Sequence, residues 1–391
     1  MSFFILKGTT RRIITHVFIF VVLTVCLLPK NAVASPVERY DFGDISYRVT
    51  KSWEPDVALY VAQHFAAENG FNEQDVSVTK LKAGAANNFI YFVFIDNQMT
   101  FVIKGLSSER EADALLALQN YPKLQAIQNN AKAATVCLSK LIQFYQVKND
   151  AHIYYFAILE AAQGQELFKI MNDELLQHKD LNKLKDIFYR MGQQISELHK
   201  SVVGDDQFIS PRNLATVIHD DFHPENTFYT IETNRLSLID NESMGVSIAN
   251  PLPIAREIYG LYEIPIIRWP SEKVTIDILK AADPHDIASI YIELINGMAS
   301  VYQNPDDAKN LFLKTIIELN NMAIAFLEDN NSEPWMLYPT DKREDHIVWG
   351  KLSHAVNNPK LAEIYISKLK TITSDLSLTI DLSTGLGLEL H

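Results

Sequence analysis

Three polar side chains stand at a fixed spacing near the middle of the chain. The stretch from Val217 to Asn226 places His219, Asp221 and Asn226 in the order H-x-D-x-x-x-x-N, and an apolar segment further on ends in Asp240. Phosphoryl transfer uses parts of this kind. One carboxylate accepts the proton of an attacking hydroxyl, and a second carboxylate with an amide oxygen holds Mg²⁺ against nucleotide phosphates. Asp221 suits the first role, and Asp240 with Asn226 suits the second.

Chance is an alternative explanation for so short a pattern. Three fixed residues, each present at a few per cent, match about once in 10⁴ starting points. A loop with incidental polar residues would look the same. The assignment therefore depends on whether the rest of the chain supplies the elements that must hold these residues.

The hydrophobic pattern predicts a small sheet followed by a long helical part. Residues 76–81, 89–95 and 100–104 are expected to form three antiparallel strands, with a turn at Asp96-Asn97-Gln98. After Gly164 the pattern is helical almost to the end of the chain. This order indicates an α+β, two-lobed layout that changes near residues 160–164. The other predicted elements are helices at 55–68 and 108–119, strands around 141–146 and 153–159, and helices at 180–200, 284–303, 306–328 and 359–373.

Composition excludes several classes of protein. A length of 391 residues allows two or three domains, or one domain with two lobes. Charged residues make up 21% and hydrophobic residues 47%, which is typical of a globular protein and argues against disorder. The net charge of −13 makes nucleic acid a poor partner. The two cysteines, Cys26 and Cys137, are too few for a disulfide scaffold or a zinc site built on Cys pairs.

The first 34 residues have the order of a secretory signal peptide. Basic residues precede an apolar run from Ile13 to Leu28, and Ala32 and Ala34 then supply the small residues of a cleavage site. We therefore expect export to the periplasm or medium, delivery into a host cell included, and no stable membrane span after cleavage. An uncleaved anchor is the alternative, although the run is short for a span of about 20 residues.

The central stretch resembles the catalytic loop of the aminoglycoside phosphotransferase and choline kinase family, which has the protein-kinase-like fold. The family pattern is H-G-D-[LF]-[HN]-P-x-N, and this chain has His219-Asp-Asp-Phe-His-Pro-Glu-Asn226, with Asp220 in place of Gly. Leu238–Glu242 resembles the metal-binding strand end, and Met191–His199 resembles the helix before the loop. The resemblance implies ATP and Mg²⁺ as cofactors, Asp221 as catalytic base, and Asn226 and Asp240 as metal ligands.

Two upstream residues resemble the family's ion pair. Lys104, in Val102-Ile-Lys104, resembles the third-strand lysine that neutralises nucleotide phosphates. Glu111 resembles the helix glutamate that pairs with this lysine, and we prefer it to Glu109 because an alanine follows it directly. The resemblance implies that Lys104 and Glu111 act together in catalysis.

Two further segments resemble the family's nucleotide-binding parts. The stretch from Glu160 to Gly164 resembles the linker between the lobes, which implies that Glu160 and Ala162 lie at the adenine. Gly84 stands where the family has a Gly-rich phosphate loop, but it is the only glycine in that loop here.

The resemblance covers about residues 76–262. Together with the signal-peptide pattern and the hydrophobic spacing, it divides the chain into a signal peptide (1–34), an N-terminal helical extension (35–75), a kinase-like N-lobe (76–160) and a helical C-lobe with the catalytic loop and substrate region (161–391). One departure follows the metal-binding aspartate. The family often has P-x-x-D-[IL]-A there, whereas Pro251–Ala255 places Pro253 or Ile254 where the Asp is expected.

Three hypotheses on function remain open at this level. The leading one is an ATP- and Mg²⁺-dependent kinase that phosphorylates a hydroxyl of a small molecule, cationic acceptors included, in an exported bacterial effector-like protein. The second is a kinase acting on a protein or another macromolecule. The third is a pseudokinase that binds without catalysis, which the Gly-poor loop and the missing Asp near Pro253 favour. The acceptor and the oligomeric state do not follow from the sequence.

Overall fold

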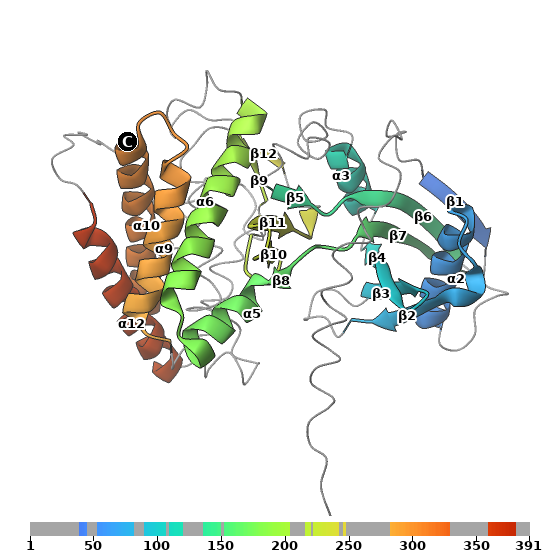
Figure 1. The fold of residues 1–391 in the computed structure, drawn as a ribbon, viewed down its shortest axis with the longest axis horizontal. Helices are drawn as coiled ribbons and strands as arrows, with labels where there is room; N and C mark the ends of the chain where they lie inside the picture. The colour runs from blue at the N-terminus through green and yellow to red at the C-terminus, as the bar shows by residue number, and fades with distance from the viewer. Residues whose placement is uncertain are drawn as a thin grey trace, which may run out of the picture. The chain divides into compact units, whose positions relative to one another are not determined.

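The computed structural model describes residues 39–44, 53–81, 90–106, 109–119, 136–149, 152–203, 216–219, 222–241, 245–247, 282–328 and 359–380. They form two compact units (Figure 1). The first unit draws its described residues from Met1–Tyr121 and Ser139–Gln163, and the second draws them from Pro122–Leu138 and Gly164–His391. The predicted signal peptide lies outside the described residues. Within the described ranges, no helix is both long enough and apolar enough to cross a membrane.

The first unit is built on a six-stranded sheet in the order β1-β6-β7-β4-β3-β2. β1 runs parallel to β6, and the other neighbouring strands are antiparallel. The predicted strands are confirmed, with small shifts at their ends. The strands are β1 (Arg39–Asp44), β2 (Val76–Lys80), β3 (Ile90–Ile95), β4 (Gln98–Leu106), β6 (Leu141–Asn149) and β7 (His152–Glu160).

The turn between β3 and β4 follows the prediction from its sequence. Only Asp96 and Asn97 separate the two strands, and their φ angles are +52° and +63°. Two-residue hairpin turns of this left-handed kind match the twist of the flanking strands, and Asn and Asp tolerate the conformation better than most residues. The turn sets the register in which β3 pairs with β4.

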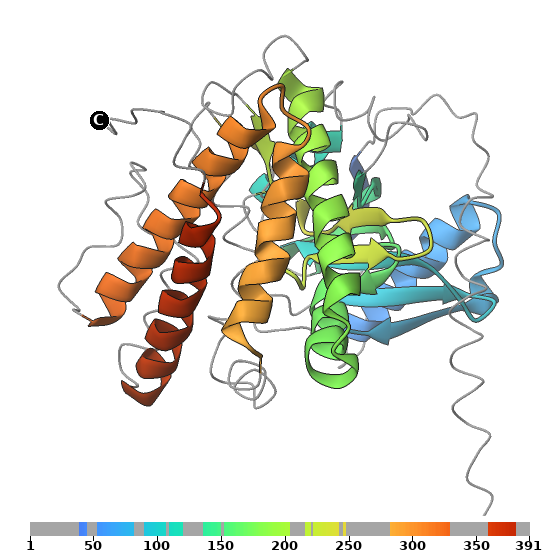
Figure 2. The same cartoon turned by 60° about the vertical axis from the view of Figure 1, so that its left-hand side comes forward.

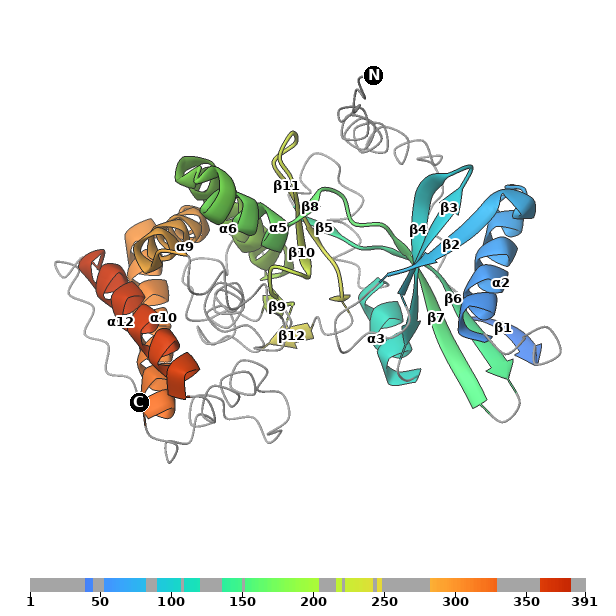
Figure 3. The ribbon, with the colours of Figure 1, turned by 90° about the horizontal axis from the view of Figure 1, so that it is seen from below.

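Helices cover both faces of this sheet. Neighbouring residues of a strand point to opposite faces, so each face has its own apolar side chains to bury. Phe101 and Ile103 of β4 pack with α2 (Trp53–Glu68). Leu106 of the same strand packs instead with Leu115 of α3 (Glu109–Gln119). Figure 3 shows the two helices on either side of the sheet. Both helices were expected at these places from their hydrophobic spacing.

β1 and α2 come from the stretch 35–75 that the sequence assigned to an N-terminal helical extension. In the structure β1 pairs with β6, and α2 buries Val57, Val61 and Phe65 against the sheet of the first unit. The spacing of apolar residues indicates a helix but not the surface that receives it. β1 reads Arg-Tyr-Asp-Phe-Gly-Asp, which is too polar to be recognised as a strand.

The second unit contains several short strands, although the sequence predicted helix almost throughout after Gly164. Four strands form a sheet in the order β5-β11-β10-β8, and β9 pairs with β12. Runs of two to four residues are too short to show a period of two, so only the strand before Asp240 was expected. The strands are β5 (Val136–Leu138), β8 (Gln165–Glu166), β9 (Thr216–Ile218), β10 (Thr227–Thr230), β11 (Arg235–Leu238) and β12 (Gly245–Ser247).

Helices make up most of the described residues of the second unit. α9 (Pro284–Ala299) packs against α6 (Leu181–Val203), α10 (Pro305–Glu328) and α12 (Pro359–Leu378), and α10 also packs against α12 (Figure 2). These four helices lie close to the ranges predicted from the sequence. The coarse prediction is therefore confirmed: the protein is α+β, with a mainly antiparallel sheet in its N-terminal part and helices in its C-terminal part.

Two glycines allow α6 and α9 to pack backbone against backbone. A Cβ atom on Gly192 of α6 would lie 2.1 Å from the carbonyl oxygen of Leu294, and one on Gly297 of α9 would lie 1.9 Å from that of Tyr189. Real Cβ atoms essentially never approach other heavy atoms within 3.0 Å. Each helix therefore needs a glycine where the other passes.

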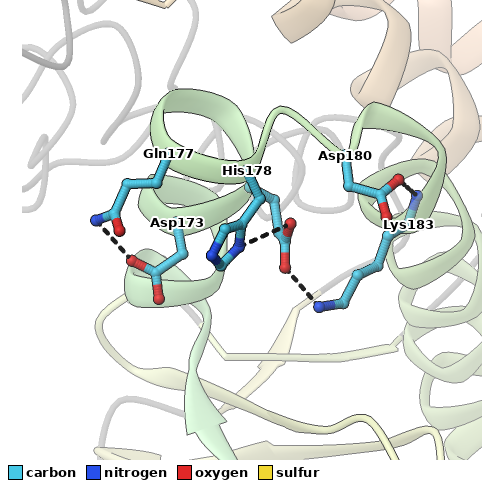
Figure 4. A network of polar contacts seen from close by, with 6 residues as sticks. Asp173, Gln177, His178, Asp180 and Lys183 are labelled. Carbon is cyan, nitrogen blue, oxygen red and sulfur yellow. Dashed lines mark hydrogen bonds and ion pairs between the residues drawn. The ribbon is translucent and has the colours of Figure 1, made fainter.

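A polar network joins the start of α6 to the helical segment before it (Figure 4). The π-helical segment η4 (Asp173–His178) follows α5 (Leu167–Asn172). Its Glu174 is buried, accepts a hydrogen bond from Lys183 Nζ at 2.5 Å and lies 3.4 Å from His178 Nδ1. Because the buried carboxylate has a lysine partner, we interpret this network as structural.

An exposed ion pair between α9 and α12 predicts a dependence of stability on pH. His285 Nδ1 lies 2.7 Å from Asp375 Oδ2, and this hydrogen bond and the charge of Asp375 raise the histidine pKa above its ordinary value of 6.5. The pair therefore stabilises the fold fully below about pH 6.5, while Asp375 is ionised, and its contribution is lost as pH rises through the raised pKa. We expect the melting temperature of His285→Gln to fall below that of the wild type at pH 6 and to match it at pH 8.5, in low salt. Equal differences at both pH values would contradict this expectation.

Candidate functional site

The hairpin of β10 and β11 brings Asn226 and Asp240 to one end of the same ribbon. Thr227 pairs with Leu238, so Asn226 directly precedes the ladder and Ile239 directly follows it. The Ile239 N–H donates to the Asn226 carbonyl oxygen at 3.0 Å, which extends the pairing by one step. Asp240 is the next residue. Asn226 and Asp240 therefore lie near each other along the backbone, at the open end of the hairpin.

His219 joins this end of the hairpin from a third segment. It directly follows β9, its side chain is buried, and its Nε2 lies 2.7 Å from the Ile239 carbonyl oxygen. Asp221 is separated from His219 by one residue in the sequence, but Asp220 and Asp221 lie outside the described residues. The structure thus shows the start of the H-x-D-x-x-x-x-N stretch beside the metal-ligand candidates, and it does not test the role of Asp221.

The loop that leads into β10 is tightly hydrogen-bonded. The carbonyl oxygen of His223 accepts hydrogen bonds from the Asn226 N–H at 2.9 Å and from Thr227 Oγ1 at 2.8 Å. The Glu225 N–H points to His223 Nδ1 at 3.3 Å. These local bonds fix the backbone of Asn226 at the start of the strand, and the residue is only 5% exposed.

Asp240 has a backbone conformation that few side chains adopt. Its φ angle is +58°, in the left-handed region, where Asp and Asn are several-fold enriched over other non-glycine residues. Such residues recur at functional sites, because the surrounding structure must hold them there. Asp240 takes this conformation two residues after β11 ends.

The donor set at the hairpin end fits a hard cation such as Mg²⁺. A carboxylate and a side-chain amide oxygen are ligands that Mg²⁺ accepts, and Mg²⁺ usually keeps several waters or phosphate oxygens beside one or two protein groups. Among the described residues, no group of three or more His, Cys, Asp and Glu side chains could hold a metal ion. The candidates here are therefore Asn226 and Asp240, with the remaining ligands left to water and substrate.

Lys104 lies in the first unit, on the face of the sheet that α3 covers. It is only 2% exposed, and its cross-strand neighbour is Ala157, a member of the cluster around Leu115 of α3. Lysine is almost never fully buried unless it is paired. The backbone of Glu111 belongs to α3, four residues or about one helical turn before Leu115. The side chain of Glu111 lies outside the described residues, so the predicted ion pair stays a prediction.

The predicted nucleotide-binding residues are only partly described. Gly84 lies outside the described residues. Glu160 ends β7, where its N–H donates to the Lys140 carbonyl oxygen at 2.9 Å and its own carbonyl accepts from Ser139 Oγ at 2.8 Å. Ala162 follows in a short connection and is half-buried. Nothing in these contacts tests whether either residue meets adenine.

Gly164 brings β8 against the hairpin. Its φ angle is +96°, and a Cβ atom there would lie 2.4 Å from the carbonyl carbon of Tyr229. No residue with a side chain fits both the conformation and the space. The sequence pattern changes from strands to helices near Gly164. The close approach to Tyr229 explains why a glycine is needed at this position.

Gln194 of α6 is a site-supporting residue that the sequence reasoning missed. It is 5% exposed, and both ends of its amide bond the backbone of the β10–β11 hairpin. A signal was present in the sequence. Gln194 lies on the apolar face of its helix, among the buried residues Met191, Ile195 and Leu198, where a polar side chain needs a specific partner.

Neither the family models nor the curated proteins contain a match to this chain.

Proposed function

We propose that this protein is an ATP- and Mg²⁺-dependent phosphotransferase with a protein-kinase-like fold, and that it moves the γ-phosphate of ATP to a hydroxyl of a small molecule. The observation that carries the proposal is the hairpin end, where Asn226, Asp240 and the His219 contact come together. This is the arrangement that the H-x-D-x-x-x-x-N pattern and its distant Asp call for. The two-part α+β fold and the buried Lys104 support it.

Each candidate residue has a role in the proposed reaction. Asn226 and Asp240 would hold Mg²⁺, which neutralises charge on the nucleotide phosphates when it is bound. Lys104 would bind those phosphates from its sheet, and Glu111 would orient Lys104. Asp221 would accept the proton of the acceptor hydroxyl while the hydroxyl oxygen bonds to the γ-phosphorus. The bond from that phosphorus to the β,γ-bridging oxygen breaks, and ADP leaves.

Small-molecule acceptors are preferred because of the resemblance around Phe222-His-Pro224 and the long helical C-terminal part. For the nucleotide, the proposed binding residues are Glu160 and Ala162 of the predicted linker and the loop that contains Gly84. Binding of nucleic acid is not expected, since the net charge is −13.

Thermal unfolding with nucleotides tests the proposal directly. A ligand that binds only the folded state raises the melting temperature by mass action. We expect ATP to raise it in the presence of Mg²⁺ and to raise it much less in EDTA. ATP consumption would then be measured over amino alcohols, sugars, nucleosides and host proteins. A small-molecule acceptor supports the proposal, a protein acceptor favours the macromolecule kinase, and no shift with any nucleotide favours the pseudokinase.

Lys104→Met is expected to weaken nucleotide binding about 10-fold or more, because a charge-assisted hydrogen bond to a phosphate is worth roughly 1.5–3 kcal/mol. Methionine has similar length, so the unfolding transition should remain cooperative. Lys80→Met is the matched control, since Lys80 is an exposed residue of the edge strand β2 in the same sheet. Isothermal titration with Mg-ATP measures both variants. Equal affinities for the two would remove Lys104 from the proposed site.

Export is the second part of the proposal, and its prediction is a mature N-terminus near Ser35. The order of basic residues, apolar run and small residues before Ser35 motivates it. Mass spectrometry of the protein from the periplasmic and medium fractions of a bacterial host would identify the terminus. A chain that keeps Met1 and sediments with membranes would show an uncleaved anchor instead.

A further inference from the structure

Gln194 joins helix α6 to the hairpin that bears the metal-ligand candidates. Its Nε2 donates to the carbonyl oxygen of Asn234 at 2.8 Å, and its Oε1 accepts from the Leu236 N–H at 2.8 Å. Its Nε2 also lies 3.3 Å from the carbonyl oxygen of Arg190, one helical turn earlier in α6. The whole amide group is therefore used, and it bonds the hairpin at two backbone positions.

One bonded position ends the turn of the hairpin, and the other, Leu236, lies in β11 two residues later. Asn234 closes the turn with a φ angle of +51°, and its Oδ1 accepts from the Tyr229 hydroxyl at 3.3 Å. Tyr229 is itself buried, and burial raises the pKa of its hydroxyl to about 12, so it remains a neutral donor. The turn is thus held from two sides, by Gln194 of α6 and by Tyr229 of β10.

Strand β11 connects the positions bonded by Gln194 to Asp240. Asp240 lies four residues after Leu236, or about 13 Å along an extended chain. From Leu236 to Leu238, β11 is paired with β10 on one side and with β5 on the other, and the Ile239 N–H then bonds the Asn226 carbonyl oxygen. A shift of β11 at Leu236 would therefore move Ile239 and Asp240 relative to the loop that leads into β10.

We propose that Gln194 is a positioning residue for the Asn226–Asp240 pair, and that it acts by fixing the register of the β10–β11 hairpin on α6. The inference rests on the proposed function, since a Mg²⁺ site gives the pair its purpose. An apolar residue could fill the same space on this face of the helix, but it would leave the Leu236 N–H and the Asn234 carbonyl oxygen without these hydrogen bonds. Glutamine supplies, in addition to packing, the two hydrogen bonds to the backbone of the hairpin.

The test compares Gln194→Met with Gln193→Met and Leu369→Ala. Gln193 is the neighbouring residue of α6, and its amide bonds Ser300 at 3.4 Å instead of the hairpin. Leu369 is buried in α12, and its truncation lowers stability without touching the hairpin. One readout is hydrogen exchange of the Ile239 amide, which needs no ligand. The other is the Mg²⁺ concentration that gives half of the ATP-dependent thermal shift.

We expect Gln194→Met to speed exchange at Ile239 at least 10-fold and to raise the half-saturating Mg²⁺ concentration at least 10-fold. Gln193→Met should change neither readout. Leu369→Ala should lower the melting temperature and leave the Mg²⁺ midpoint unchanged. Gln194→Glu, which keeps the acceptor for Leu236 and loses the donor to Asn234, should fall between Gln194→Met and the wild type.

Two results would overturn the inference in different ways. If Gln194→Met and Gln193→Met behave alike in Ile239 exchange and Mg²⁺ midpoint, Gln194 does not position the pair. If the wild type shows no Mg²⁺-dependent shift, the proposed function fails and the metal half of the inference fails with it. Ile239 exchange still decides in that case whether Gln194 holds the hairpin end.

Discussion

Replacement of Asp240 by alanine is expected to abolish the Mg²⁺-dependent part of the thermal shift with ATP, whereas Asp221→Ala should keep that shift and lose catalysis. Asp240 stands with Asn226 at the hairpin end, where a ligand can be held firmly. Removing a metal ligand removes Mg-nucleotide binding, while removing a base spares binding and lowers the rate. The loss for a general base is about 10²–10⁴-fold, at the lower end if the transition state is loose.

The left-handed backbone of Asp240 calls for a second variant. Alanine tolerates a φ angle of +58° less well than aspartate, so Asp240→Ala also alters the chain locally. Asp240→Asn keeps a residue that accepts this conformation and removes only the charge. Both variants should lose Mg²⁺ dependence, and Asp186→Ala, at an exposed site of α6, should not. Normal Mg-ATP binding by Asp240→Asn, or full activity of Asp221→Ala, would show that the roles are assigned wrongly.

Gly297→Ala is expected to destabilise the second unit by about 3 kcal/mol or more, although the same change at an exposed helix position stabilises by about 1 kcal/mol. The new methyl group would lie 1.9 Å from the Tyr189 carbonyl oxygen, so α6 and α9 must separate. For a part of this size, the melting temperature should fall by about 6–12 °C. Differential scanning calorimetry would measure the change.

The pairing of the two glycines makes this prediction sharper. Gly192→Ala should have a similar effect, because its Cβ would lie 2.1 Å from the Leu294 carbonyl oxygen. Once one methyl group has separated the helices, the second costs less, so the double variant should lose less than the two single losses combined. Asn296→Ala, at the residue before Gly297, is the control and should change stability little. A stabilised Gly297→Ala would contradict the helix packing described above.

Regular elements with a clear period could be predicted from the sequence, and short ones could not. α2, α6 and α10 each repeat apolar residues over four or more turns, so their positions follow from spacing alone. β8 has two residues and β5 has three, and such runs carry no period. Both form strands because the hairpin offers edges to pair with, which is a property of distant residues.

Some features of the candidate site could likewise be predicted from the sequence, and others could not. The motif predicted that Asn226 and Asp240 hold one metal ion, and the structure places the two residues at the same end of the β10–β11 hairpin, which the sequence did not predict. Their role as metal ligands stays a prediction. The contact of His219 with Ile239 and the two bonds of Gln194 could not be predicted, because each joins segments 20 or more residues apart. The roles of all the candidate residues stay predictions, and Asp221, Gly84 and the side chain of Glu111 lie outside the described residues.

β5 has a consequence for how the chain can be divided. Val136–Leu138 belongs to the second unit, yet the chain before and after the Pro122–Leu138 segment belongs to the first. The polypeptide therefore passes between the units three times, and the second unit is not one continuous stretch of sequence. A fragment that starts at Gly164 would leave one edge of β11 open, with unpaired backbone groups available to another chain. During synthesis, Val136–Leu138 has to wait until Arg235–Leu238 has been made before the two strands can pair, so the second unit cannot be completed until almost a hundred residues after its first strand.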